Sequence, residues 1–152
     1  MRTVVTEFIR QAELHPDNIA VLDIHGAATY DRINRMSACL AEQILERIGG
    51  RENRGRIALL LPRNKFYLVA LLAAARAGCA AVPMDWEYPA ERVRLMTEDI
   101  RCRLCITAKA REGDLPEVPC MFLEDVVQED TDLSGADTAL DLSDADAEGL
   151  IL

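Results

Sequence analysis

The chain has 152 residues, of which 50% are hydrophobic and 28% are charged, a composition that excludes a chain disordered throughout and is typical of a globular domain. The formal net charge of -9 is concentrated near the end, because residues 113–152 contain no lysine or arginine and 12 of the 26 acidic residues. Residues 1–112 carry 14 acidic and 17 basic residues, a net charge of +3. We interpret the acidic segment as a solvated loop and exclude nucleic acid as its partner.

Five cysteines are an odd number, which favours reduced thiols in a cytosolic protein over a disulfide framework. They are Cys39, Cys79, Cys102, Cys105 and Cys120. No apolar signal-peptide core follows Met1, and the longest central run without charge, residues 66–75, is far shorter than the roughly 20 residues of a membrane span. We therefore expect a cytoplasmic protein with no membrane partner.

The first third of the chain predicts two amphipathic helices separated by a short strand. The first helix should end near His15-Pro16, because the residue before proline is pushed away from helical angles. Residues 19–24 read as an apolar strand, followed by a turn at Gly26. Thr29 can cap the second helix, which Gly49-Gly50 should end. The apolar stripe of this second helix consists of Ile33, Met36, Leu40, Ile44 and Ile48.

The centre of the chain predicts a strand, a helix and a second strand. Residues 57–61 form an unbroken apolar run, as expected of a strand covered on both faces in a parallel sheet. Asn64 can cap a helix over residues 65–77, which is rich in Leu and Ala. Gly78 can take the left-handed conformation that ends this helix, and residues 79–82 form the next strand.

The last third predicts a surface helix over residues 87–97 and two more strands, at residues 104–107 and 121–123. Alternating helices and strands indicate an α/β fold with a parallel-rich sheet flanked by helices. We expect three parts: an α/β subdomain over residues 1–123, an acidic loop or linker over 124–147, and the start of a truncated strand over 148–152.

Two motifs are weak candidates for a ligand or metal site. The glycines in Gly50-Arg-Glu-Asn-Arg-Gly55-Arg56 follow a helix and precede a strand, whereas a phosphate-binding loop follows a strand and opens a helix. Cys102-Arg-Leu-Cys105 has the spacing of half a zinc site, but residues three apart on a strand point to opposite faces. We expect these two thiols to diverge and to fill a core, and we assign no catalytic, cofactor-binding or metal-binding residue.

Three sequence motifs resemble the beginning of nonribosomal peptide synthetase adenylation domains, members of the superfamily of adenylate-forming, AMP-binding enzymes. Ala28-Thr29-Tyr30-Asp31-Arg32-Ile33 is similar to the family motif Leu-Thr-Tyr-x-Glu-Leu, with Arg32 in place of glutamate. Ala75-Arg76-Ala77-Gly78-Cys79-Ala80-Ala81-Val82-Pro83-Met84-Asp85 is similar to Leu-Lys-Ala-Gly-x-Ala-Tyr-Val-Pro-Leu-Asp. Tyr88-Pro89-Ala90-Glu91-Arg92 resembles the Tyr-Pro-x-Glu-Arg that follows it. The order and spacing also agree, over almost the whole chain.

The resemblance implies an N-terminal subdomain, truncated, of an enzyme that activates an amino or other carboxylic acid. In the intact parent family, ATP and Mg²⁺ convert the acid to an acyl-adenylate, which then passes to the thiol of a carrier protein. The family's phosphate-binding motif and catalytic lysine lie beyond residue 152. We therefore expect a scaffold that needs the remainder of the adenylation domain and is inactive alone.

Two other functions are open. The chain resembles the region to which a small MbtH-like activator docks, which implies a non-catalytic interaction module for that activator or for the rest of a split synthetase. The residues that the resemblance assigns to docking are Tyr88, Pro89, Ala90 and Arg92, with Ala90 expected to be exposed. A complete small α/β binding protein is the third hypothesis, and it requires the apolar end at Leu152 to be covered.

Overall fold

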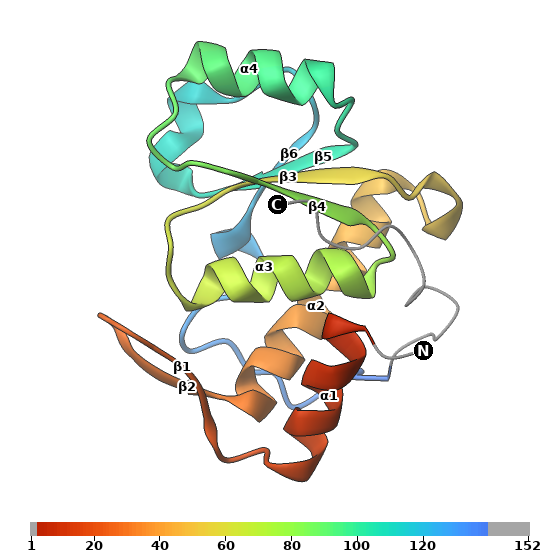
Figure 1. Ribbon diagram of the computed structural model, residues 1–152, viewed down its shortest axis with the longest axis vertical. Coiled ribbons are helices and arrows are strands. Elements are labelled where there is room, and N and C mark those ends of the chain that lie inside the picture. The colour runs from red at the N-terminus through yellow and green to blue at the C-terminus, as the bar shows by residue number, and fades with distance from the viewer. Residues whose placement is uncertain (1–2, 140–152) are drawn as a thin grey trace.

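A computed structural model of the chain describes residues 3–139. The helices and strands follow one another in an α/β order, and Figure 1 shows them as a sheet between helices. In chain order they are α1 (Val4–Leu14), β1 (Ile19–Asp23), β2 (Gly26–Thr29), α2 (Tyr30–Ile48), β3 (Arg56–Leu60), α3 (Lys65–Arg76), β4 (Ala80–Met84), α4 (Ala90–Asp99), β5 (Leu104–Thr107) and β6 (Cys120–Phe122). Short 3-10 helices occur at η1 (Arg51–Asn53), η2 (Lys109–Asp114) and η3 (Leu123–Asp125).

The main sheet has the strand order β4-β3-β5-β6, and every neighbouring pair is parallel. This confirms the predicted α/β fold and the strand-helix-strand unit at its centre. Asn64 caps α3 by accepting a hydrogen bond from the Phe66 N–H at 2.9 Å. Gly78 follows the helix with φ of 75°, the left-handed conformation that glycine adopts without strain. The second strand of the unit lies slightly later than predicted, at Ala80–Met84.

Both faces of the main sheet are covered, by different helices. In Figure 1, α4 lies on one side of the sheet and α3, α2 and α1 lie on the other. Successive strand residues alternate between these sides, because a strand has a period of two. On β3, Ile57 and Leu59 belong to the larger buried cluster, with α2 and α3, whereas Ala58 and Leu60 belong to the smaller cluster beneath α4.

The segment before α2 differs from the prediction. Gly26 is not simply a turn, because residues 26–29 form a second strand that pairs antiparallel with β1 in a separate hairpin. The turn before it is fixed by Asp23, whose carboxylate accepts the His25 N–H at 2.8 Å. Thr29 then caps α2, as predicted, by accepting the Arg32 N–H at 3.1 Å. A four-residue Gly-Ala-Ala-Thr strand has low strand propensity, so sequence pattern alone did not reveal it.

Residues 124–139, which we call the acidic strap, continue from η3 along the helices rather than as a purely solvated loop. Val127 and Leu133 are buried in the larger core cluster. The boundary at residue 123 stays a prediction, and the expected truncated strand at 148–152 lies outside the described residues. Within residues 3–139, no helix has both the length and the apolar character needed to cross a bilayer.

Candidate functional site

The four residues assigned to docking lie together where the chain enters α4. Pro89 is exposed and occupies the N-cap position of α4, and Arg92 is exposed one turn later. The Arg92 guanidinium carbon lies 4.2 Å from the centroid of the Tyr88 ring, a cation–π contact. Ala90 is half-buried, so the expectation that it is exposed is wrong. Val93, one turn later, is fully buried, because α4 packs closely against the sheet. The surface is thus an exposed proline beside a stacked tyrosine and arginine.

Arg111, which sequence reasoning did not single out, supports this surface from η2. Its guanidinium donates to the carbonyl oxygens of Trp86 at 2.6 Å and Tyr88 at 2.9 Å, and its Nε donates to Asp114 at 3.1 Å. The guanidinium carbon also lies 5.5 Å from the Trp86 ring centroid. One side chain therefore fixes the β4–α4 loop, residues 85–89, from a segment more than 20 residues away in sequence.

An open cavity of about 990 Å³ lies at the carboxyl ends of the parallel strands. Its wall includes Leu61 after β3, Ala108 after β5 and Leu123 at the end of β6, together with strap residues 127–130 and His25 of the hairpin turn. Ligands of open α/β sheets commonly bind outside the carboxyl ends of strands. The charged side chains on this wall are Lys109, Glu124, Glu129 and Asp130, so acidic groups predominate.

Lys65, beside this cavity, is a buried cation in the first turn of α3. Only 1% of the residue is exposed, and its Nζ lies 2.7 Å from the Glu129 carboxylate and 3.9 Å from that of Asp23. A positive charge at a helix N-terminus opposes the helix dipole, so these two carboxylates compensate it. Asp23 also accepts the Lys65 backbone N–H at 2.9 Å, and this bond is the main reason that the pKa of Asp23 is lowered. The positive charge of Lys65 is thus compensated by carboxylates of this chain.

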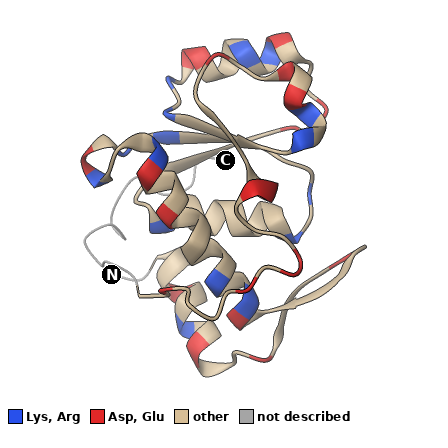
Figure 2. Cartoon of the chain, turned by 180° about the vertical axis from the view of Figure 1, so that it is seen from behind, with Lys and Arg blue, Asp and Glu red and all other residues tan. Residues whose placement is uncertain are grey.

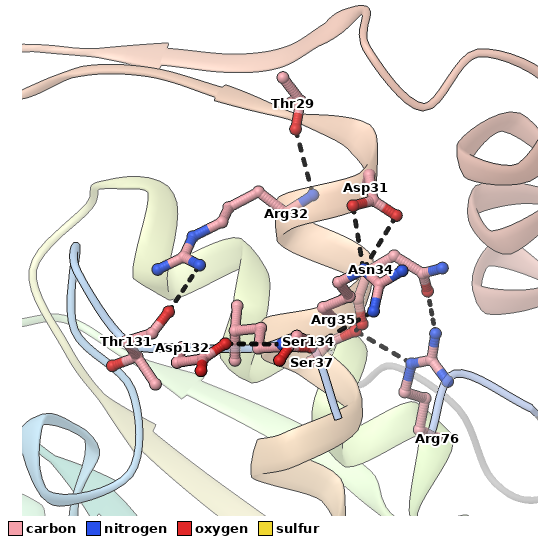
Figure 3. Close-up of polar contacts among 11 residues, drawn as sticks. Thr29, Asp31, Arg32, Asn34, Arg35, Ser37, Arg76, Thr131, Asp132 and Ser134 are labelled. Carbon is pink, nitrogen blue, oxygen red and sulfur yellow. Dashed lines mark hydrogen bonds and ion pairs between the residues drawn. The ribbon is translucent and has the colours of Figure 1, made fainter. Parts of the chain in front are cut away.

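Three arginines hold the acidic strap against α2 and α3 (Figure 3). Arg32 donates to the carbonyl oxygens of Thr131 at 2.7 Å, Glu129 at 2.8 Å and Gln128 at 3.2 Å. Arg35 donates to the Leu133 carbonyl at 3.3 Å and to Asp31 at 3.0 Å. The sequence analysis noted Arg32 only because it replaces the glutamate of the family motif. A basic residue at this position and an acidic segment later in the chain could have indicated that the two are in contact.

Arg76, the third arginine, is almost completely buried and bonds to polar groups of α2. It donates to Ser37 Oγ at 2.9 Å, to the Asn34 side-chain oxygen, and to the Thr138 carbonyl at 3.2 Å. Burial lowers the pKa of Arg76 from its ordinary value to about 10, partly offset by Asp137. Arg76 therefore joins α3, α2 and the strap through one buried guanidinium.

The glycine motif at residues 50–55 does not form a phosphate cradle. Gly49 and Gly50 end α2 with positive φ angles, and η1 follows them. A Cβ placed on Gly55 would lie 2.8 Å from Arg103 Cγ, so this glycine allows a close approach of the chain to Arg103. The motif follows helix α2 and precedes strand β3, as predicted, whereas a phosphate-binding loop follows a strand and precedes a helix.

The expectation that Cys102 and Cys105 diverge is wrong. Cys102 lies in the turn before β5 rather than on the strand, and both residues contribute to the small cluster beneath α4. Both cysteines are buried, as expected. Burial raises the pKa of the Cys102 thiol to about 11. Residues 3–139 contain no group of three or more His, Cys, Asp or Glu side chains placed to hold a metal ion.

The chain matches one known protein family over most of its length. A family model described as AMP-binding enzyme matches residues 8–148. The chain is 36% identical over 114 residues to the probable non-canonical nonribosomal peptide synthetase CymA of Salinispora arenicola, covering 74% of this chain and 1% of CymA. It is 33% identical over 129 residues to the antimetabolite synthetase AmbB of Pseudomonas aeruginosa, covering 84% of this chain and 10% of AmbB. The chain thus spans a small fraction of these relatives.

Solved structures agree on the fold. The nonribosomal peptide synthetase FmoA3, in its form bound to α-methyl-L-serine-AMP, superposes with a TM-score of 0.74 at 24% sequence identity. The match covers 91% of this chain and 15% of FmoA3. At this level of identity the similarity shows a shared fold. It does not show which ligand this chain binds.

Proposed function

Because the chain belongs to the family of AMP-binding enzymes, we propose that it is the N-terminal part of an adenylation domain. The observation that carries the proposal is the family match over residues 8–148, within which the most specific motif, residues 75–85, coincides with the end of α3, the Gly78 turn and β4. The same residues that resemble the family motif thus build the centre of the observed sheet.

In the proposed parent, a substrate carboxylate attacks the α-phosphate of ATP, pyrophosphate leaves, and the acyl group then passes from the adenylate to a carrier-protein thiol. ATP and Mg²⁺ are the cofactors of that parent. The described residues do not form a site for ATP and Mg²⁺. Gly55 of the glycine motif packs against Arg103, and the charge of Lys65 is neutralised by Glu129 and Asp23. Stabilising a phosphoryl transition state requires aligned donors and cations, so we assign the chemistry to other parts of the parent.

Exposed apolar side chains on the hairpin support a role as part of a larger body. Ile19 is 61% exposed, Leu22 is 77% exposed and Ile24 is 94% exposed. Apolar residues gathered on one surface element commonly mark a contact with another protein surface. We propose that the remainder of the adenylation domain, with its carrier protein, is the partner of this chain in the cytoplasm.

The test is ATP–pyrophosphate exchange by the isolated chain in the presence of each amino acid. We expect only background exchange, because the residues described provide no phosphate site. Exchange that depends on an amino acid and exceeds the background would contradict the proposal. Sequencing the DNA downstream of Leu152 gives an independent test: a Thr-Ser-Gly-rich stretch in any frame supports an interrupted or longer adenylation domain.

The second candidate function is docking of an MbtH-like protein at Tyr88, Pro89, Ala90 and Arg92. The specific observation in its favour is pre-organisation: Arg92 stacks on Tyr88 while Arg111 fixes the loop beneath. A surface that is ordered before binding loses less conformational freedom on association.

Two substitutions test this docking in a pull-down with a cognate MbtH-like protein. Ala90→Glu places a charge at the half-buried position, and Arg92→Glu reverses an exposed charge without entering the core. Both should weaken binding by at least about tenfold, which corresponds to roughly 1.4 kcal/mol. Arg10→Glu is the matched control, since Arg10 is an exposed arginine on α1, a helix that lies far from α4 in Figure 1. Equal binding by folded Arg92→Glu would remove this surface from consideration.

A further inference from the structure

Two cysteines face one another across the edge of the main sheet. Cys105 on β5 and Cys120 on β6 are register partners in a parallel pair. Partners in a parallel pair point to the same side of the sheet, and both side chains lie at the small cluster beneath α4. Neighbouring strands are roughly 4.8 Å apart, within the span of about 4.4–6.8 Å between Cα atoms that a disulfide bridges.

The two thiols already interact. Each side chain influences the titration of the other, and Cys120 Sγ donates to the Val118 carbonyl at 3.2 Å. The neighbouring Cys105 lowers the pKa of Cys120, whereas Cys120 and burial raise the pKa of Cys105. Cys105 is fully buried and Cys120 is half-buried. An oxidant therefore reaches Cys120 first, and Cys105 is placed to react with it next.

We propose that Cys105 and Cys120 form a redox-active pair that a small disulfide oxidant, such as oxidised glutathione, converts into an intrachain disulfide. The Cys120 thiolate attacks one sulfur of the oxidant, and the oxidant's sulfur–sulfur bond breaks to release one glutathione as its thiolate, which takes up a proton. Cys105 then loses its proton and attacks the Cys120 sulfur, releasing the second glutathione. Two protein thiols are oxidised and one glutathione disulfide is reduced to two thiols.

The disulfide restricts a segment that supports the surface at α4. It closes a loop that contains η2, and η2 carries Arg111, whose guanidinium bonds to the Trp86 and Tyr88 carbonyl oxygens. Cys102 belongs to the same cluster but precedes β5 and has no strand partner there, so it is not the partner assigned to Cys120. This inference is independent of the adenylation function.

The test is peptide mapping of the whole chain after equilibration with oxidised glutathione and alkylation of the remaining thiols. Trypsin cleaves after Arg103, Lys109 and Arg111, and no lysine or arginine follows Arg111. The expected product is therefore a covalent pair of the peptides 104–109 and 112–152, lost on reduction. Cys102 falls in a separate peptide, so its participation is distinguished directly.

Two variants complete the test, each checked for folding by circular dichroism. Cys102→Ala should retain the linked pair. Cys105→Ala should stop at a glutathione adduct on Cys120, because the resolving thiol is gone. The proposal is overturned if wild-type protein gives no linked pair under conditions that modify half-buried Cys39, or if Cys102 replaces Cys105 in the link. If Cys105→Ala does not fold, the wild-type and Cys102→Ala maps still decide.

Discussion

The two faces of the main sheet carry different numbers of large buried side chains. The face toward α2 and α3 presents mainly large side chains, namely Ile57, Leu59, Leu61, Leu104, Ile106 and Met121. The face toward α4 presents Ala58, Leu60, Met84, Cys105 and Cys120. Only two residues of α4, Val93 and Thr97, are fully buried, and Figure 2 shows acidic and basic positions along the same helix.

This difference suggests that the α2 and α3 side supplies most of the stability, whereas the α4 side can change its packing more easily. Burial of large apolar side chains supplies most of the stabilisation of a domain, and it is concentrated on the side of α2 and α3. The side of α4 has fewer fully buried residues, a polar helix and the two thiols. A helix held by few buried residues can shift at low cost, so the proposed docking surface and the proposed redox pair lie on the side where change is tolerated.

The largest expected effect compares Leu59→Ala with Leu60→Ala. These neighbouring leucines are both 0% exposed and point to opposite faces of β3, so they lose the same transfer free energy. The cost of the remaining cavity depends on how far the surroundings relax. We expect Leu59→Ala to lower the free energy of unfolding by about 4 kcal/mol and Leu60→Ala by about 2.5 kcal/mol, because α4 can settle onto the sheet. Urea unfolding measures both values. A larger loss for Leu60→Ala would reverse the comparison of the faces.

The next effect compares the two arginines that tie the helices. Arg76→Met leaves the Asn34 and Ser37 side-chain oxygens buried without this donor, so we expect a loss of about 2–3 kcal/mol. Arg111→Met releases the Trp86 and Tyr88 carbonyl oxygens, which lie in a surface loop where water can replace the guanidinium. We expect about 1 kcal/mol there. Hydrogen exchange of the backbone N–H groups of residues 85–88 should become faster in Arg111→Met only. Faster exchange there in Arg76→Met would contradict separate roles for the two arginines.

Much of the fold was predictable from local pattern. The apolar run after Arg56, the Asn64 cap and the Gly78 turn each have a local physical cause, and together they predicted β3, α3 and β4. The two glycines after α2 also ended that helix as expected. Such features depend on backbone conformation and on side chains a few residues away, which a single sequence displays directly.

The contacts of the candidate site depend on residues distant in sequence and were not predictable in the same way. Arg32 contacts residues nearly 100 positions later, and the acidic composition of the strap gave no sign that Val127 and Leu133 are buried. The Cys102 prediction was wrong because its strand begins at Leu104, so the two-residue period did not apply to it. The predicted strand, residues 104–107, is the observed β5, so the error was to apply the strand period to Cys102, which lies two residues before that strand.

The smallest expected effect is a pH dependence that separates the two faces. Asp23 ties the hairpin to the start of α3 by accepting the Lys65 N–H, and this bond is the main cause that lowers the pKa of Asp23 below its ordinary value of 3.8. A carboxylate with a depressed pKa stabilises the fold above its unfolded pKa, and that stabilisation is lost as the pH falls through the folded pKa. The bonds from Arg111 to the β4–α4 loop end on carbonyl oxygens, which do not titrate in this range.

Asp23→Asn should therefore be less stable than wild type at about pH 7, and the difference between the two proteins should shrink as the pH falls toward about 3. The effect is small because an asparagine oxygen still accepts the Lys65 N–H and Glu129 still faces the Lys65 ammonium. Urea midpoints across this range measure the difference, with Asp114→Asn as the matched control, since Asp114 bonds to Arg111 on the side of α4. A constant difference between wild type and Asp23→Asn at every pH would show that the charge of Asp23 does not hold the hairpin to α3.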